Sequence, residues 1–260
     1  MPELQLFCLP YSGASAMVYN RWRQRVPAWL KIHPLELPGR GIRHNEPLAN
    51  DLSMLAKALA RQIGAQLTPP YAVFGHSLGA LLGFEVVHAL RAFDCAPPLA
   101  LCASGTSAPT LREDRERGYD QPKSDEALIA DLRKFQGTPE HVLANEELMS
   151  LTLPVLRADF LLCGRYRYRL RSQLRCPLHV FAGKSDDVSA GQLAAWADET
   201  SGKFSLDMFD GGHFFIHERE PEVLRVLMQR LGADLHQSNA DASSNTDTAS
   251  PTPLSAPAAR

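Results

Sequence analysis

A serine between two glycines, placed directly after a short apolar run, constrains the fold of this chain more than any other feature. Residues 71–74 are a run of β-forming residues, residues 75–79 read GHSLG, and small and apolar residues suited to a buried helix follow. A G-x-S-x-G sequence between a strand and a helix is typical of a nucleophile elbow, in which the serine sits on a strained turn. The glycines are needed because a Cβ there would collide with the neighbouring strand or helix. The motif predicts a nucleophilic Ser77 at one edge of a sheet.

Short β-forming runs alternate along the chain with stretches of helical periodicity. The runs lie at residues 4–9, 32–37, 71–74, 99–103, 178–182 and 204–209. Apolar residues recur every three or four positions from 52 to 67 and again from 224 to 231, which predicts two amphipathic helices. This alternation is typical of α/β proteins and predicts a mostly parallel central sheet flanked by helices.

The predicted strands and helices form one domain over residues 1–232. A polar insertion at about 108–175, with helical patterns at 128–135 and 148–162, interrupts the alternation. We expect it to be a helical lid over a site at the strand ends, and the alternative is a surface excursion that only packs. Residues 233–260 are rich in Ser, Thr, Ala and Pro and contain no Phe, Trp or Tyr, which predicts a disordered tail.

A serine hydroxyl is a poor nucleophile unless a base takes its proton, so a histidine and a carboxylate should accompany Ser77. Asp186 and Asp187 follow the run at 178–182, and His213 follows the run at 204–209. The chain order Ser, Asp, His is that of the α/β-hydrolase fold. We expect a catalytic triad of Ser77, His213 and Asp186, since Asp186 comes three residues after the glycine that ends its strand; Asp187 is the alternative acid.

The turn after the first predicted strand is rich in small residues and could stabilise negative charge on a reacting carbonyl oxygen. We expect the backbone N–H groups of Ser12 and of Leu78, the residue after the nucleophile, to form an oxyanion hole. The alternative interpretation of residues 10–15 is an ordinary turn.

Charge, hydropathy and cysteine usage exclude several classes of protein. The 27 basic and 29 acidic side chains give a net charge of −2, so the chain lacks the positive charge of a typical nucleic-acid-binding protein. No run of about 18 apolar residues predicts a membrane span, and no basic start precedes the first apolar run as in a secretion signal. The five widely spaced cysteines lack CxxC spacing, which predicts reduced thiols, a cytoplasmic location and no metal site. We expect a monomer without a cofactor.

These motifs together resemble the external, or type II, thioesterases that accompany nonribosomal peptide and polyketide synthases. The resemblance extends from the first strand to about Leu231. At residues 10–14, Ser12 and Ala14 stand where the family usually has alanine and a second glycine. The stretches similar to family motifs are residues 10–14 (PYSGA), 37–47 (LPGRGIRHNEP), 75–79 (GHSLG), 153–160 (LPVLRADF) and 211–215 (GGHFF).

The resemblance implies an α/β-hydrolase fold and an enzyme that hydrolyses acyl thioesters. The substrates it implies are acyl groups on the 4′-phosphopantetheine arms of acyl carrier or peptidyl carrier proteins, and the task it implies is to clear stalled or wrongly loaded arms. A small-molecule carboxylesterase or acyltransferase on the same fold is one alternative. A non-catalytic protein that binds a synthase is another, and the presence of all three triad residues argues against it.

The densest positive cluster of the chain lies at the end of the insertion, just before the fifth predicted strand. It contains Arg165, Arg167, Arg169 and Arg171 and is extended by Arg175. We expect this cluster to help steer an acidic carrier protein toward the site. The alternative is a solvated face of a strand or helix whose tyrosines pack inward.

Overall fold

The structure is a computed structural model, and it describes residues 2–112, 118–135 and 137–246. Six strands form one sheet in the order β2-β1-β3-β4-β5-β6, and every neighbouring pair is parallel. The strands are β1 (Leu4–Leu9), β2 (Leu30–Pro34), β3 (Tyr71–His76), β4 (Leu101–Ser104), β5 (Leu178–Gly183) and β6 (Phe204–Phe209). All six strands predicted from the sequence are present, and the parallel α/β prediction is confirmed.

The ends of four strands differ from the prediction. The clearest case is β2, which was expected at 32–37 and lies at Leu30–Pro34. Its last pairing with β1 joins Pro34 to Cys8, after which Leu35 donates its N–H to the carbonyl of Cys8 and the chain leaves the sheet. Apolar character continues through Leu37 because Leu35 and Leu37 are buried in the core, not because they belong to the strand.

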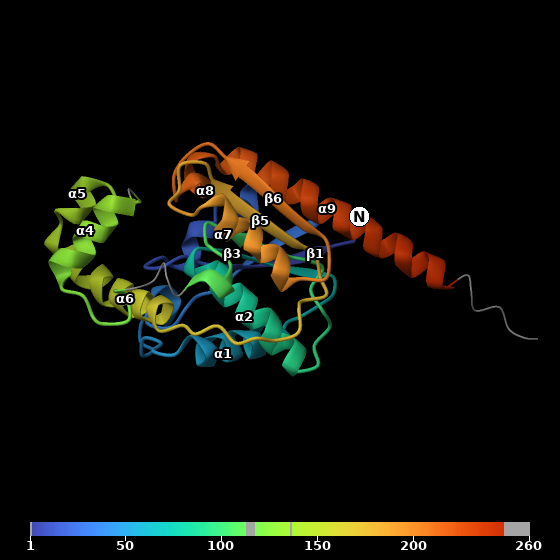
Figure 1. Ribbon diagram of the computed structural model, residues 1–260, viewed down its shortest axis with the longest axis horizontal. Helices are drawn as coiled ribbons and strands as arrows, with labels where there is room; N and C mark the ends of the chain where they lie inside the picture. The colour runs from blue at the N-terminus through green and yellow to red at the C-terminus, as the bar shows by residue number, and fades with distance from the viewer. Residues whose placement is uncertain (1, 113–117, 136, 247–260) are drawn as a thin grey trace, which may run out of the picture.

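Helices cover both faces of the sheet, as a parallel sheet requires. The helices α1 (Leu52–Gly64) and α2 (Leu78–Ala92) lie on one face and α9 (Glu220–Thr246) lies on the other (Figure 1). Successive side chains of a strand point to opposite faces, so Phe7 of β1 packs with α1 and α2 whereas Leu6 packs with α9. The short helical segments are η1 (Ala16–Tyr19), η2 (Trp22–Gln24), η3 (Gly41–Arg43), η4 (Pro109–Leu111), α7 (Ala190–Ala194), η5 (Ala195–Glu199) and α8 (Phe215–Glu218).

The insertion between β4 and β5 is helical, as predicted. It contains α4 (Asp125–Phe135), α5 (Glu140–Leu143) and α6 (Glu146–Gly164), and Figure 1 shows α4 and α5 standing beyond one end of the sheet. The insertion has a small apolar core of its own, formed by Leu128, Leu143, Met149, Leu153 and Leu156. The long helix α6 therefore connects this outer unit to the body of the protein.

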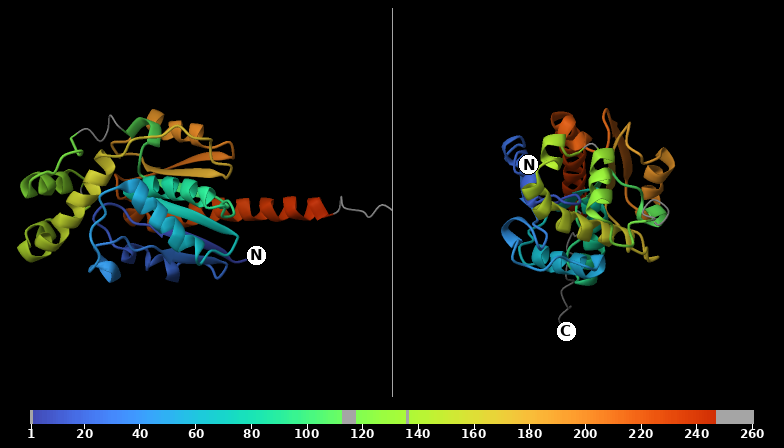
Figure 2. Two further views of the ribbon diagram at one scale, coloured as in Figure 1. Left: turned by 90° about the horizontal axis from the view of Figure 1, so that it is seen from below. Right: turned by 90° about the vertical axis from the view of Figure 1, so that its left-hand side faces the viewer.

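The prediction that the chain is disordered from residue 233 is wrong for residues 233–246, which are the last turns of α9. The helix continues because Leu235 is buried in the same apolar cluster as Leu231, and because Asp234 accepts a hydrogen bond of 2.7 Å from His179 Nε2. The Ser- and Ala-rich composition of this segment gave no indication of these two contacts. Beyond them α9 projects away from the sheet (Figure 2). Residues 247–260 lie outside the described residues.

In the described part of the chain, no helix is both long enough and apolar enough to span a lipid bilayer.

Candidate active site

Ser77 occupies the turn between β3 and α2, with φ of 54° and ψ of −115°. This positive φ is rare for a residue with a side chain, and surrounding contacts must hold it. The N–H of Ser77 donates to the carbonyl of Ser104 at 2.7 Å. A Cβ at Gly75 would collide with the backbone of Gly79, and one at Gly79 with the backbone of Leu9. The predicted strand–turn–helix elbow and the need for both glycines are confirmed.

His213 and Asp186 come together from the loops that follow β6 and β5. His213 Nδ1 donates to Asp186 Oδ2 at 2.9 Å, and the Asp186 side chain is only 3% exposed. Asp187 is 66% exposed and pairs with Lys134 at 3.4 Å. The geometry therefore favours Asp186 over its neighbour as the carboxylate that orients the imidazole, and leaves His213 Nε2 for another partner.

The two loops are fixed to each other by backbone contacts. The N–H of Lys184 donates to the carbonyl of Phe209 at 2.8 Å, and the N–H of Ser185 donates to the carbonyl of Gly211 at 3.0 Å. A Cβ at Gly183 would collide with the carbonyl of Gly212. This close approach of the two loops fixes the position of the Asp186 carboxylate relative to the His213 imidazole.

Ser77 and His213 line one pocket of about 180 Å³. Phe214 forms part of the wall on the side of the sheet, and the insertion contributes Phe135 and Phe160. The Phe135 ring lies 5.8 Å from the His213 ring, measured between centroids. A nucleophilic serine in a small pocket lined in part by phenylalanine rings suits an acyl group whose carbonyl is brought to Ser77.

The structure places the two residues predicted for the oxyanion hole at the turn after β1 and at the start of α2. Ser12 lines the pocket, and Leu78 is the first residue of α2, where an N–H has no acceptor within its own helix. Next to Ser12, Gly13 has φ of 79° and donates its N–H to Asp159 Oδ2 at 2.8 Å. The turn is thus held by the insertion, and the role of the Ser12 and Leu78 N–H groups stays a prediction.

His76 lies beside the site but is a core residue. Its Nδ1 hydrogen-bonds with Ser104 Oγ at 2.9 Å, and its ring centroid lies 5.0 Å from that of His213. Burial, together with the nearby His213, holds the pKa of His76 well below its usual value, so this imidazole stays neutral. Behind it, His217 Nε2 hydrogen-bonds with the Tyr11 hydroxyl at 3.0 Å.

A buried ion pair that the sequence did not reveal ties the insertion to the oxyanion turn. Arg40 donates to both carboxylate oxygens of Asp159, at 2.6 and 2.7 Å, and the Asp159 side chain is 0% exposed. Arg40 also donates to the carbonyl of Ala14 at 3.4 Å. In the sequence the two residues belong to two separate motifs, 119 positions apart. The signal available in the sequence was a charged residue inside each motif, without any indication that the two charges meet.

Breaking this pair should reduce both stability and activity. Asp159→Ala leaves the Arg40 charge buried and unpaired, which costs about 3–5 kcal/mol, and frees the N–H of Gly13. The double variant Arg40→Met/Asp159→Leu removes both charges, so it should recover most of the melting temperature. It should nevertheless keep a defect in kcat of about a hundredfold, because the oxyanion turn has lost its acceptor. Thermal unfolding and steady-state kinetics of both variants measure this, and full kcat in the double variant would contradict a positioning role for Asp159.

The predicted arginine cluster lies in an irregular segment after α6, and not on a strand or a helix. Tyr166 is buried and donates its hydroxyl proton to Glu85 at 2.8 Å, as the packing alternative expects for the tyrosines. Arg171 donates to both oxygens of the same carboxylate. Arg165, Arg167 and Arg169 are exposed.

Among the described residues, no cluster of three or more His, Cys, Asp or Glu side chains could hold a metal ion, and none of the five cysteines forms a disulfide.

Comparison with known proteins decides the family. The sequence pattern of the family described as thioesterase domain matches residues 4–231. The chain belongs to the thioesterase family. The resemblance to type II thioesterases seen in the sequence is confirmed, and so is the α/β-hydrolase fold.

The relatives of this thioesterase include proteins named for biosynthetic pathways. It is 36% identical to the gramicidin S biosynthesis protein GrsT of Aneurinibacillus migulanus, over 88% of this chain and 89% of that one. It is 32% identical to the thioesterase PikA5 of Streptomyces venezuelae, over 88% and 81% of the two chains. Among solved structures, the type II thioesterase BorB from the borrelidin cluster superposes with a TM-score of 0.81 at 35% identity, covering 89% of this chain and 95% of that one.

Proposed function

We propose that this thioesterase removes acyl groups from the 4′-phosphopantetheine arms of carrier proteins in nonribosomal peptide or polyketide synthesis. The observation that carries the proposal is the His213–Asp186 pair at the wall of the pocket that holds Ser77. The relatives named above support the carrier-bound substrate, since their names place them in the biosynthesis of gramicidin S and borrelidin. Clearing stalled or wrongly loaded arms is the task that fits such an enzyme.

The reaction begins with the attack of Ser77 on the thioester. His213 Nε2 takes the hydroxyl proton as Ser77 Oγ bonds to the carbonyl carbon, and Asp186 holds the Nδ1 proton and stabilises the imidazolium. The N–H groups of Leu78 and Ser12 bind the oxyanion. As the tetrahedral intermediate collapses, the C–S bond breaks and His213 returns the proton to the pantetheine sulfur. The acyl group is then an ester of Ser77.

Water completes the cycle. His213 takes a proton from a water molecule that attacks the ester carbonyl, and then protonates Ser77 Oγ as the free acid leaves. A thioester is already a reactive acyl donor, so no binding energy needs to be spent on a particular acyl group. The aromatic walls formed by Phe135, Phe160 and Phe214 recognise apolar surface and not one substituent pattern. We therefore expect broad acyl tolerance.

A direct competition between thioester and oxygen ester tests the proposal. Carrier domains loaded with acetyl, short branched and aromatic acyl groups are incubated with the enzyme and followed by intact-protein mass spectrometry. We expect loss of the acyl mass from several carriers, with a kcat/KM at least about a hundredfold above that for the matched small oxygen ester. Equal or faster cleavage of the oxygen ester would favour a small-molecule carboxylesterase on the same fold.

The expected cytoplasmic location and monomeric state remain part of this proposal. The lack of a disulfide among the five cysteines is consistent with a reducing compartment.

A further inference from the structure

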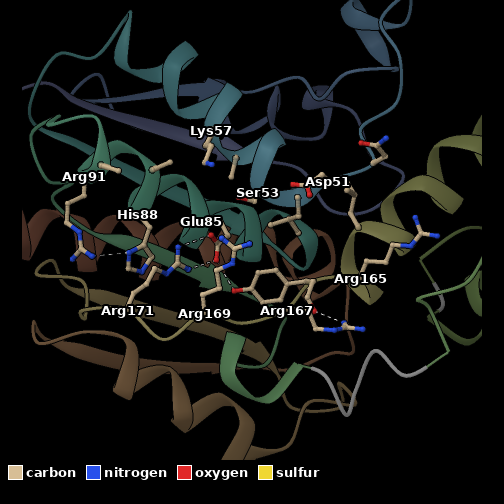
Figure 3. A pocket seen from close by; sticks show the side chains of 17 residues that line it. Asp51, Ser53, Lys57, Glu85, His88, Arg91, Arg165, Arg167, Arg169 and Arg171 are labelled. Atoms are coloured by element: carbon tan, nitrogen blue, oxygen red, sulfur yellow. Dashed lines mark hydrogen bonds and ion pairs between the residues drawn. The ribbon is translucent and has the colours of Figure 1, made fainter.

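A groove of about 600 Å³ runs along α2 on the side of the sheet that carries α1. One wall is α1 and another is the irregular segment after α6, so the arginine cluster of the sequence faces the two helices (Figure 3). The groove is lined by six cationic side chains and two carboxylates, which gives it a net charge of +4 in a chain whose total charge is −2. The cations are Lys57, Arg91, Arg165, Arg167, Arg169 and Arg171.

Two of these cations serve the fold. Arg171 makes a two-pronged ion pair with Glu85, which also accepts the Tyr166 hydroxyl (Figure 3). Arg91 donates to the backbone carbonyls of Ser172 and Gln173 and so fixes the segment to α2. Burial and the charges of Arg171 and Arg91 lower the pKa of His88 to about 3, so this imidazole adds no positive charge at neutral pH.

The other four cations are available to bind a partner. Within the described residues, no carboxylate pairs with Lys57, Arg165, Arg167 or Arg169. Arg165 donates to the backbone carbonyl of Asp120 and Arg167 to those of Gly164 and Tyr166, so neither charge is compensated by a carboxylate among the described residues. Beside Arg169, the side chain of Leu170 is 90% exposed. Leu170 lies outside the groove lining, next to Arg169 in the chain. Uncompensated cations beside an exposed apolar residue are typical of a protein-binding surface, because charge steers the encounter and the apolar group adds contact area.

The groove starts within reach of the site. A rise of 1.5 Å per helical residue places Glu85 about 12 Å and Arg91 about 21 Å along α2 from Ser77. A phosphopantetheine arm of roughly thirteen bonds extends about 16 Å from phosphorus to sulfur. On α6, Cys163 lines the catalytic pocket and Leu162 lines the groove, so the two cavities are neighbours. A carrier protein seated on the near half of the groove could deliver its thioester to Ser77.

We propose that this groove is the docking surface for an acidic face of the carrier protein, with Lys57, Arg165, Arg167 and Arg169 as its contacts. The inference rests on the proposed function, since it supplies the protein partner of the same site. It changes the sequence prediction in two ways. Arg171 is a fold-stabilising residue and not a contact, and Lys57, more than one hundred positions away in the chain, joins the surface.

Charge reversal tests the docking surface. Lys57→Glu/Arg169→Glu alters two exposed side chains that have no carboxylate partner among the described residues. Two substrates are compared: an acyl carrier protein, and a short acyl thioester without carrier or phosphate. We expect the ratio of kcat/KM for the carrier to kcat/KM for the short thioester to fall at least about tenfold. The wild-type ratio should also fall as salt rises from 50 to 500 mM, and the variant ratio should respond less.

Arg225→Glu is the matched control, because Arg225 is an exposed arginine on α9, on the opposite face of the sheet. It should keep the wild-type ratio. If wild-type enzyme cleaves both substrates and the double variant keeps the wild-type ratio, the docking surface is refuted while the proposed function stands. If wild-type enzyme cleaves neither thioester, the proposed function itself fails. Thermal unfolding of each variant verifies that the comparison is made between folded proteins.

Discussion

Ser77→Ala is expected to lower the rate of acyl release from a carrier protein by about 10⁵- to 10⁶-fold. The variant has no oxygen at the turn that β3 and α2 present to the pocket, so no acyl-enzyme can form and water must attack the thioester directly. The remaining donors of the oxyanion turn and the bound geometry still favour that slow attack over the reaction in solution. The measurement is a single-turnover assay with excess enzyme, in which the acyl-serine mass is sought in the wild type and should be absent from the variant.

The control for this experiment is Ser238→Ala, which changes an exposed serine on α9 far along the chain from the site. It should hydrolyse at the wild-type rate. A Ser77→Ala enzyme that kept full hydrolysis would remove the covalent mechanism and would revive the alternative of a protein that only binds a synthase.

The second large effect is expected for Asp186→Asn, which should lower kcat about 10⁴-fold with a small change in KM. The amide can present an N–H to His213, which favours the wrong tautomer of the imidazole and leaves the imidazolium without a countercharge. The adjacent Asp187→Asn supplies a matched control, since it removes a carboxylate that is exposed and pairs only loosely with Lys134. We expect it to retain activity within about threefold of wild type. Steady-state kinetics on one carrier substrate compare the two variants, and a greater loss for Asp187→Asn would overturn the assignment of the acid.

The sequence predicted those features that are determined by neighbouring residues. The elbow follows from local sterics, because a chain can turn from β3 into α2 around Ser77 only if Gly75 and Gly79 lack side chains. The positions of Asp186 and His213 follow from the same logic, since each comes just after a strand and parallel strands end at one edge. The five residues at these strand ends therefore sufficed to predict a serine hydrolase mechanism.

Features that depend on distant partners were not predicted. The pairing of Arg40 with Asp159 needs a loop after β2 to meet α6, and no local pattern encodes that meeting. The extension of α9 depends on the burial of Leu235 and on the buried hydrogen bond between Asp234 and His179. Similarly, the sequence suggested that the arginines of the cluster are equivalent, whereas in the structure Arg171 differs because it pairs with Glu85.

The anchoring of α6 by Asp159 has a consequence for how long acyl chains enter. The middle of α6 cannot swing outward without exposing Arg40 and releasing Gly13, so we expect any widening to come from α4 and α5, which pack on α6 through a small apolar core. We therefore expect acyl chains too bulky for this pocket to displace the outer pair of helices, near Phe135, while the turn at Gly13 keeps its shape. Two parts of the same insertion thus have different roles. The outer helices α4 and α5 determine which acyl chains fit, and the middle of α6 keeps the oxyanion turn in place.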